Sequence, residues 1–84
     1  MVITEIRMNK LNSDSKVKAV VSVTFDKSFV VTDIKVIEND RGLFVAMPSK
    51  RDSAGVFHDI AHPVNSDMRL YIQNIVLEEY NKQN

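Results

Sequence analysis

The sequence predicts one α+β domain, residues 1–84, in which a mostly antiparallel sheet of about five strands, a meander plus a hairpin, is covered by one C-terminal helix. Two observations support this prediction. Apolar and polar side chains alternate along the first half of the chain, which is the two-residue period of a strand with one buried face. Near the C-terminus, apolar side chains recur at spacings of three and four, which is the period of a helix. A core this small, in a chain without cysteine, favours dimerisation as a further source of burial.

The meander is predicted from three segments, which are 2–9, 17–25 and 28–37. In the first segment, one face is expected to hold Val2, Thr4, Ile6 and Met8. In the second, the buried face is expected to hold Val17, Ala19, Val21, Val23 and Phe25. The third is rich in β-branched residues, which are typical of strands. Short polar connections between these segments favour antiparallel pairing of sequence neighbours.

A fourth strand is predicted at 43–47, after a turn that contains Gly42. Apolar residues occupy both of its faces, so both faces are expected to contact protein. Pro48 lacks a backbone N–H and is expected to end the strand. Residues 56–62 are then expected to return as a fifth strand, which makes the hairpin.

The last element is predicted to be a helix that begins near Asn65 or Ser66, either of which can cap it. Its apolar face is expected to hold Met68, Tyr71, Ile72, Ile75, Val76 and Tyr80. Leu70 and Leu77 lie off this stripe. They are expected to be exposed, and contact with a second subunit is the alternative. The polar tail 81–84 is expected to fray.

The formal net charge is zero, but the charges are unevenly distributed. Residues 1–51 hold nine Lys and Arg against six Asp and Glu, and residues 52–84 hold two against five, which gives +3 and −3. This polarity can orient a polyanion, and it is also common by chance in short chains. No apolar run approaches the roughly 18 residues of a membrane span, so we expect a cytoplasmic protein without membrane contact.

The residues do not predict metal binding or catalysis. His58 and His62 are four residues apart, and in a strand their Cα atoms would be about 13 Å apart, which is too far for one zinc ion. Local hydrogen bonding is the more ordinary role for them. The chain has no cysteine nucleophile, and its two glycines cannot make a Gly-rich phosphate loop. We therefore expect no metal, no cofactor and no enzymatic activity.

Three cations are the candidate functional residues. Lys50 and Arg51 are expected in the connection of the predicted hairpin, and Arg41 in the turn before the fourth strand. Cations on loops can reach phosphates, and arginine can bind one through two hydrogen bonds. Contact with nucleic acid is one interpretation of these residues, and ordinary solvated surface charge is the other. Base stacking is not expected, because three phenylalanines are assigned to the core, namely Phe25, Phe29 and Phe44.

Three segments carry a resemblance to a known family. They are 29–37 (FVVTDIKVI), 42–51 (GLFVAMPSKR) and 59–66 (DIAHPVNS). Together they resemble the stage V sporulation protein G family, SpoVG, over nearly the whole chain. The resemblance implies a homodimer, formed by β-strand pairing, that regulates septation, sporulation and gene expression by binding DNA or RNA. It also implies that Lys50 and Arg51, which match the basic pair of the family, contact nucleic acid; Arg41 is added from its position alone.

The chain departs from the family pattern after the basic pair. Its turn reads Asp52-Ser53-Ala54-Gly55 instead of Thr-Pro-Asp-Gly, which places an acid beside Arg51 and is expected to weaken phosphate attraction. A second interpretation of the chain is a protein-interaction module that influences division through a protein partner. The zero net charge and the two apolar faces of 43–47 favour that interpretation.

Overall fold

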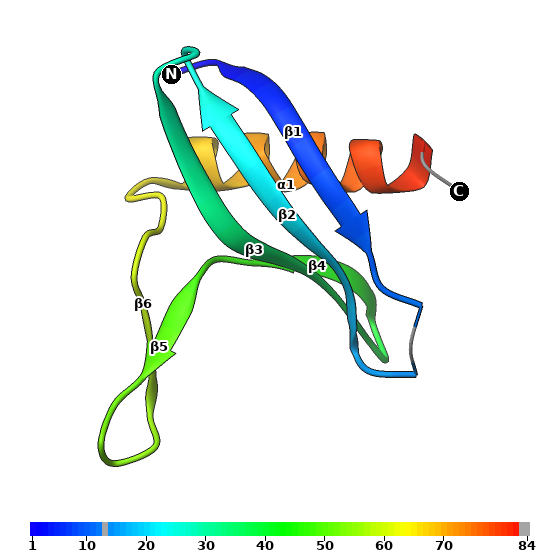
Figure 1. Ribbon diagram of the computed structural model, residues 1–84, viewed down its shortest axis with the longest axis vertical. Coiled ribbons are helices and arrows are strands. Elements are labelled where there is room, and N and C mark those ends of the chain that lie inside the picture. The colour runs from blue at the N-terminus through cyan, green and yellow to red at the C-terminus, as the bar shows by residue number, and fades with distance from the viewer. Residues whose placement is uncertain (13, 83–84) are drawn as a thin grey trace.

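The computed structural model describes residues 1–12 and 14–82. In chain order the elements are β1 (Ile3–Lys10), β2 (Val17–Phe25), β3 (Phe29–Asn39), β4 (Gly42–Ala46), β5 (Ser49–Arg51), β6 (Phe57–Asp59) and α1 (Ser66–Lys82). Strands β1 to β4 pair in sequence order as one antiparallel sheet, and β5 pairs with β6 in a separate two-stranded sheet. Helix α1 crosses one face of the large sheet, and the β5–β6 hairpin projects away from it (Figure 1). The predicted α+β class and the predicted meander are confirmed.

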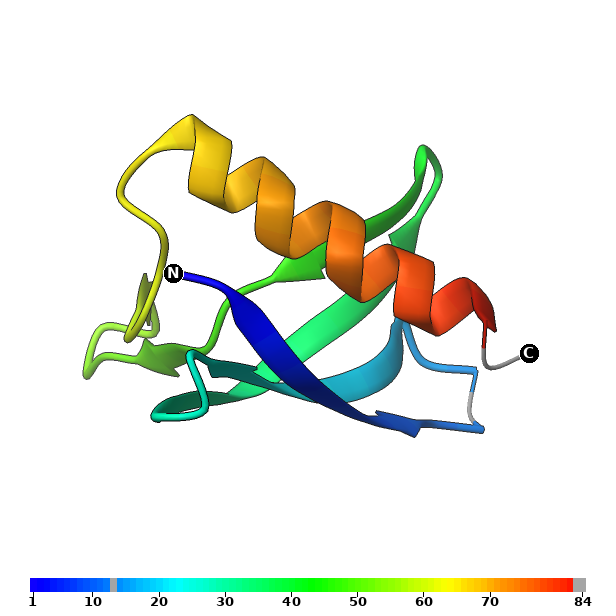
Figure 2. The same cartoon turned by 90° about the horizontal axis from the view of Figure 1, so that it is seen from above.

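The core lies between the large sheet and α1, which are seen from above in Figure 2. Its buried residues are Ala19, Val21, Val23, Phe25, Ile34, Val36, Ile72 and Val76. The register pairs Val21 of β2 with Ile34 of β3, so buried side chains of neighbouring strands meet on the face that α1 covers. The strict alternation of β2 therefore predicted its buried face correctly from Ala19 to Phe25.

The start of β1 differs from the sequence expectation. The register with β2 shifts between Ile3 and Glu5, which is a β-bulge. Because a bulge adds one residue to the strand, Ile3 packs against the core together with Ile6, while Val2 and Thr4 are exposed. The predicted shared face of Val2, Thr4 and Ile6 is therefore wrong at this end of the strand.

The connection between β2 and β3 is a tight turn at Asp26 and Lys27. Both residues have positive φ, 51° and 55°, and the Ser28 N–H donates to the Phe25 carbonyl at 2.9 Å. Such left-handed pairs match the twist of a β-hairpin. Asp33, inside β3, also has a positive φ of 62°, close to where the β2–β3 register shifts. Aspartate tolerates this conformation better than the β-branched residues around it.

The predicted hairpin is wrong in its strand pairing. Strand β4 pairs with β3 and extends the meander, so it is not the partner of residues 56–62. Only Phe57–Asp59 of that segment is strand, and it pairs with β5. The alternation along 56–62 predicted a strand but carried no information about its partner. Pro48 ends β4 as expected, and a new short strand begins directly after it.

Helix α1 is capped by Asn65, whose Oδ1 accepts the Met68 N–H at 2.7 Å. Leu70 is exposed as expected, whereas Leu77 packs against the core, so the expectation for Leu77 is wrong. The helix continues through Lys82, so the first half of the predicted frayed tail is helical, and residues 83–84 lie outside the described residues.

Within the described part of the chain, no helix has both the length and the apolar character needed to cross a membrane.

Candidate nucleic-acid interface

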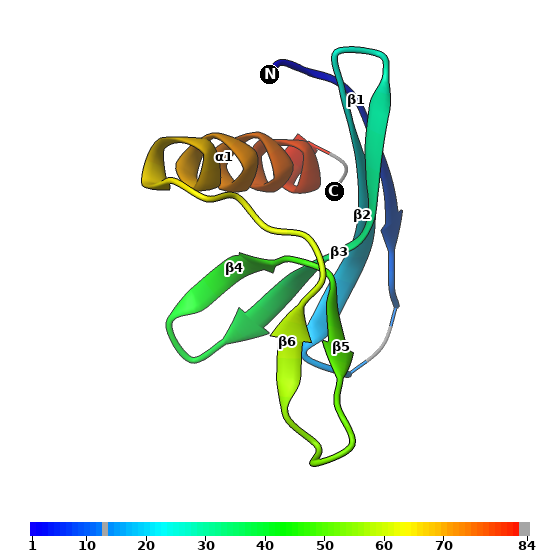
Figure 3. The same cartoon turned by 90° about the vertical axis from the view of Figure 1, so that its left-hand side faces the viewer.

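The β5–β6 hairpin is an arm outside the main core (Figure 3). Pro48 is buried at its base, where the Pro48 carbonyl accepts the Ile60 N–H at 2.8 Å. Every residue from 49 to 60 is exposed. The arm therefore presents its side chains to solvent on both faces, and its shape depends on its own hydrogen bonds.

Asp52 closes the turn of this arm. Its Oδ1 accepts the backbone N–H groups of Ala54 and Val56, both at 2.9 Å, and its Oδ2 lies 2.7 Å from His58 Nε2. The hydrogen bond from the Val56 N–H, followed by that from the His58 side chain, holds the pKa of the Asp52 carboxyl below its ordinary value of 3.8. The carboxylate is thus directed toward the turn and His58. Within the described residues it forms no ion pair with Arg51, the cation that the sequence places beside it.

Lys50 and Arg51 lie in strand β5, so their predicted position in a loop is wrong. The turn takes only the residues after Arg51, because Lys50 pairs with His58 and Arg51 pairs with Phe57. Consecutive strand residues point to opposite faces, so the two cations lie on opposite faces of the ribbon. Neither cation has a carboxylate within ion-pair distance among the described residues. Both positive charges are available to a ligand.

Arg41 lies in the turn between β3 and β4, as predicted. Its backbone N–H donates to Asn39 Oδ1 at 2.9 Å, and Gly42 follows with a φ of 120°. This turn lies away from the tip of the β5–β6 hairpin in both views (Figures 1 and 3). The structure therefore brings Lys50 and Arg51 together on one arm and leaves Arg41 on a different part of the surface.

The phenylalanines are less buried than the sequence predicts. Phe25 is in the core, but Phe29 is 63% exposed and Phe44 is also exposed. Phe57, to which no role was assigned, is 65% exposed, and the Arg51 guanidinium carbon lies 5.5 Å from its ring centroid. The turn expected at residues 52–55 would set Arg51 opposite Val56. The observed register leaves residues 52–56 between the two strands and therefore sets Arg51 opposite Phe57.

The two histidines have separate local partners. His58 bonds Asp52, and His62 Nδ1 lies 3.0 Å from the Pro63 carbonyl oxygen. The expected local hydrogen-bonding role is confirmed for both. Across residues 1–12 and 14–82, no three or more potential metal ligands gather in one place.

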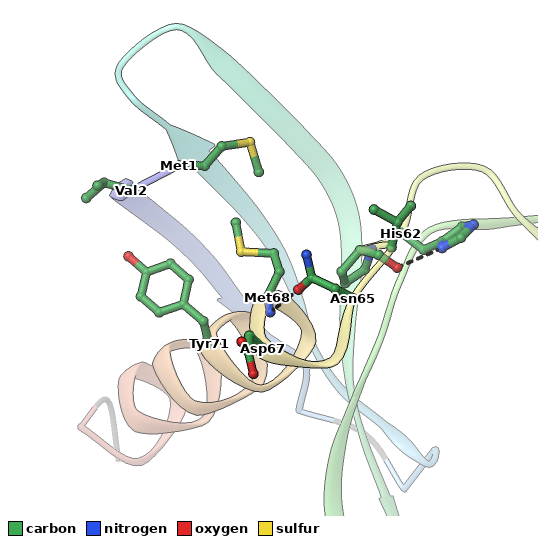
Figure 4. A pocket seen from close by; sticks show the side chains of 9 residues that line it. Met1, Val2, His62, Asn65, Asp67, Met68 and Tyr71 are labelled. Atoms are coloured by element: carbon green, nitrogen blue, oxygen red, sulfur yellow. Dashed lines mark hydrogen bonds between the residues drawn. The ribbon is translucent and has the colours of Figure 1, made fainter.

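An apolar groove lies at the N-terminal end of α1 (Figure 4). It has a volume of about 710 Å³ and is lined by Met1, Val2, His62, Pro63, Val64, Asn65, Asp67, Met68 and Tyr71. The Tyr71 hydroxyl accepts the Ile3 N–H at 3.0 Å, which holds the start of β1 beside the helix. Val64 is 89% exposed at this groove. The groove is a second surface, separate from the arm that carries the cations.

Comparison with known proteins places the chain in a family. The SpoVG family matches residues 1–82. A protein of Caldanaerobacter subterraneus subsp. tengcongensis is 60% identical over 82 residues, which cover 98% of this chain and 90% of that protein. Proteins of Clostridium novyi (55% over 80 residues; 95% and 80% covered) and Staphylococcus aureus (52% over 82 residues; 98% and 82% covered) are also similar. All three bear the name "Putative septation protein SpoVG". With most of the chain matched at this identity, the protein belongs to the SpoVG family.

Proposed function

We propose that this protein is a cytoplasmic, homodimeric regulator of gene expression, septation and sporulation that binds the phosphate backbone of DNA or RNA. Lys50 and Arg51 are the main contacts, and Arg41 is a weaker one. The observation that carries the proposal is that Lys50 and Arg51 project on an exposed arm without a carboxylate partner among the described residues. The septation role is supported by the name that the relatives bear.

The shape of the arm suits a phosphate-lined groove. A two-stranded β-ribbon fits the major groove of duplex DNA. Because Lys50 and Arg51 lie on opposite faces of the ribbon, one cation can approach each wall of phosphates. In this arrangement the contacts position the protein along the helix and carry no base sequence information of their own.

Dimerisation would double these contacts. Strands β1 and β4 are the edges of the four-stranded sheet, so each carries backbone N–H and C=O groups that can pair with a second subunit. A dimer built by such pairing has two β5–β6 arms and four arm cations. Two linked arms bind one long polyanion far more tightly than either arm alone.

A protein-interaction module is the second candidate function, and the apolar groove at the start of α1 favours it. The groove is open, and the exposed side chains of Val2 and Val64 contribute to it. In this alternative, a protein partner covers the groove, and binding of nucleic acid is incidental. The arm cations then have no effect on the function.

Fluorescence anisotropy separates the two candidates. Labelled duplex DNA and labelled single-stranded RNA are titrated with the native protein and with Lys50→Ala/Arg51→Ala, and light scattering checks that the variant is still dimeric. The matched control is Lys16→Ala/Lys82→Ala, which removes the same charge at exposed positions off the arm. We expect the arm variant to lose affinity much more than the control. Native protein that binds neither probe at moderate salt would instead favour the interaction module.

A further inference from the structure

The ring of Phe57 is an apolar surface that the fold does not use. It is 65% exposed and does not belong to the core cluster, so it contributes little apolar burial to folding. A single exposed apolar side chain is ordinary. Phe57 differs from the others because a guanidinium group lies over its ring.

The backbone register fixes this neighbour. Arg51 and Phe57 are directly opposite each other in the β5–β6 pair, so their side chains share one face of the ribbon, and the guanidinium carbon lies 5.5 Å from the ring centroid. Within the described residues, Arg51 has no ion pair with a carboxylate. An exposed aromatic ring that is in contact with a cation is the combination on which single-stranded nucleic acids bind, with the base stacked on the ring and the phosphate on the cation.

From this geometry we propose that Phe57 is a base-stacking platform, and that it makes the arm bind single-stranded nucleic acid in preference to duplex. The inference rests on the proposed function, because Arg51 and Lys50 supply the phosphate contacts. In a duplex, the faces of the bases are stacked on one another and only their edges are accessible, so the Phe57 ring has nothing to stack on. In a single strand, a base can leave its neighbours and lie on the ring.

Two carboxylates limit where the strand can run. Asp59 shares the face of Arg51 and Phe57, because its register partner is Ser49, and it lies toward the base of the arm. Asp52 lies beyond Arg51, but its oxygens are held by the turn and by His58. The phosphate bound by Arg51 therefore avoids Asp59 and lies on the side of the turn. This predicts that Asp59→Asn strengthens binding to single strands and to duplex alike.

The test compares Phe57→Ala with the native protein on three probes of equal length, namely oligothymidylate, oligouridylate and a DNA duplex. Loss of one stacked base is worth about 1–3 kcal/mol, so we expect roughly five- to 150-fold weaker binding to the single strands and about twofold or less on the duplex. Leu70→Ala, which removes an exposed apolar side chain on α1, is the control and should leave all three affinities unchanged. A loss on only one of the single strands supports stacking and identifies the preferred strand as DNA or RNA.

A direct optical readout is available because the chain has no tryptophan. The indole introduced by Phe57→Trp should be quenched when a base stacks on it, so its fluorescence should fall with both single strands and stay nearly constant with duplex. Phe57→Leu, which keeps an apolar side chain without an aromatic face, should behave like Phe57→Ala.

Three results would overturn the inference. One is an equal loss on duplex and single strands in Phe57→Ala, which would assign Phe57 to the shape of the arm. Another is native affinity in Phe57→Leu, which would show that apolar contact suffices, as for a protein partner. The third is native affinity for single strands in Phe57→Ala while Lys50→Ala/Arg51→Ala loses binding. That result would exclude base stacking on Phe57 and leave the proposed function intact. If the native protein binds none of the probes, both proposals fail together.

Discussion

Asp52 illustrates how one side chain decides the local chemistry of the arm. The sequence places an acid next to Arg51, which would be expected to cancel part of its charge. In the structure, three hydrogen bonds direct the carboxylate toward the turn and His58. The sequence shows that an acid follows Arg51, but it does not show where the carboxylate points. That orientation depends on the turn, in which Gly55 has a φ of 85°, and on the register that places His58 opposite Lys50.

The pKa of Asp52 gives a prediction at this scale. A carboxyl whose folded pKa is lowered stabilises the hairpin when ionised, so its contribution is present above the unfolded value near 3.8 and is lost as the pH falls through the lower, folded value. We expect the Val56 amide resonance to shift with pH with a midpoint below 3.8, because this N–H is bonded to the carboxylate. A midpoint at or above 3.8 would contradict the turn geometry. In Asp52→Asn, which keeps an oxygen acceptor without the charge, the transition should disappear.

At the scale of elements, periodicity identified the helix and the strands except the short β5, but it could not identify every pairing partner. The two-residue period of β2 predicted its buried face because all of its inward residues are apolar. In β1 the same argument failed at Val2. A bulge there reverses which residues face the core, and the alternation of apolar and polar residues does not show it. The run 56–62 was recognised as a strand, but its pairing with Ser49–Arg51 depends on a turn whose residues also suit other loops. The pairing of strands is therefore the part of the fold that a local sequence pattern does not predict.

The start of α1 was predicted from the capping residues, and substitutions of Asn65 test this cap. Asn65 Oδ1 accepts the Met68 N–H at 2.7 Å, which satisfies one of the free donors of the first turn. Asn65→Ala should lower the free energy of unfolding by about 1 kcal/mol, within a usual range of roughly 0.5–2 kcal/mol. Asn65→Asp, which retains the acceptor, should stay close to native. Urea unfolding followed by circular dichroism measures both variants, and an alanine variant as stable as native would show that the cap contributes little.

For the whole molecule, stability depends on one small core on a single side of the sheet. Ile34 of β3 is fully buried in this core. Ile34→Ala should cost about 2–5 kcal/mol, which is a large part of the roughly 5–15 kcal/mol available to a native domain. Leu70→Ala, at an exposed helix position, should change stability by no more than about 0.5 kcal/mol. Urea midpoints compare the two, and similar midpoints would contradict the position of the core.

The distribution of charge is also a property of the whole molecule. The whole chain is neutral, and its first 51 residues carry the excess of +3. Composition alone therefore could not predict where on the molecule cations are exposed. The fold places the last two cations of that half on an arm outside the core, and the carboxylate next to Arg51 in the sequence, Asp52, is engaged by the turn. The sequence identified these residues through a basic dipeptide and a family resemblance, while their positions on opposite faces of a ribbon required the structure.

The most direct measurement is the salt dependence of binding to duplex DNA. Each phosphate contact contributes about 0.9 to the slope of log K against log salt concentration. A dimer that uses Lys50 and Arg51 in each subunit should therefore lose roughly two to four units of slope in the Lys50→Ala/Arg51→Ala variant, while Lys16→Ala/Lys82→Ala keeps the native slope. If the arm variant remains dimeric and retains the native slope, the β5–β6 arm is not the phosphate-binding surface of this protein.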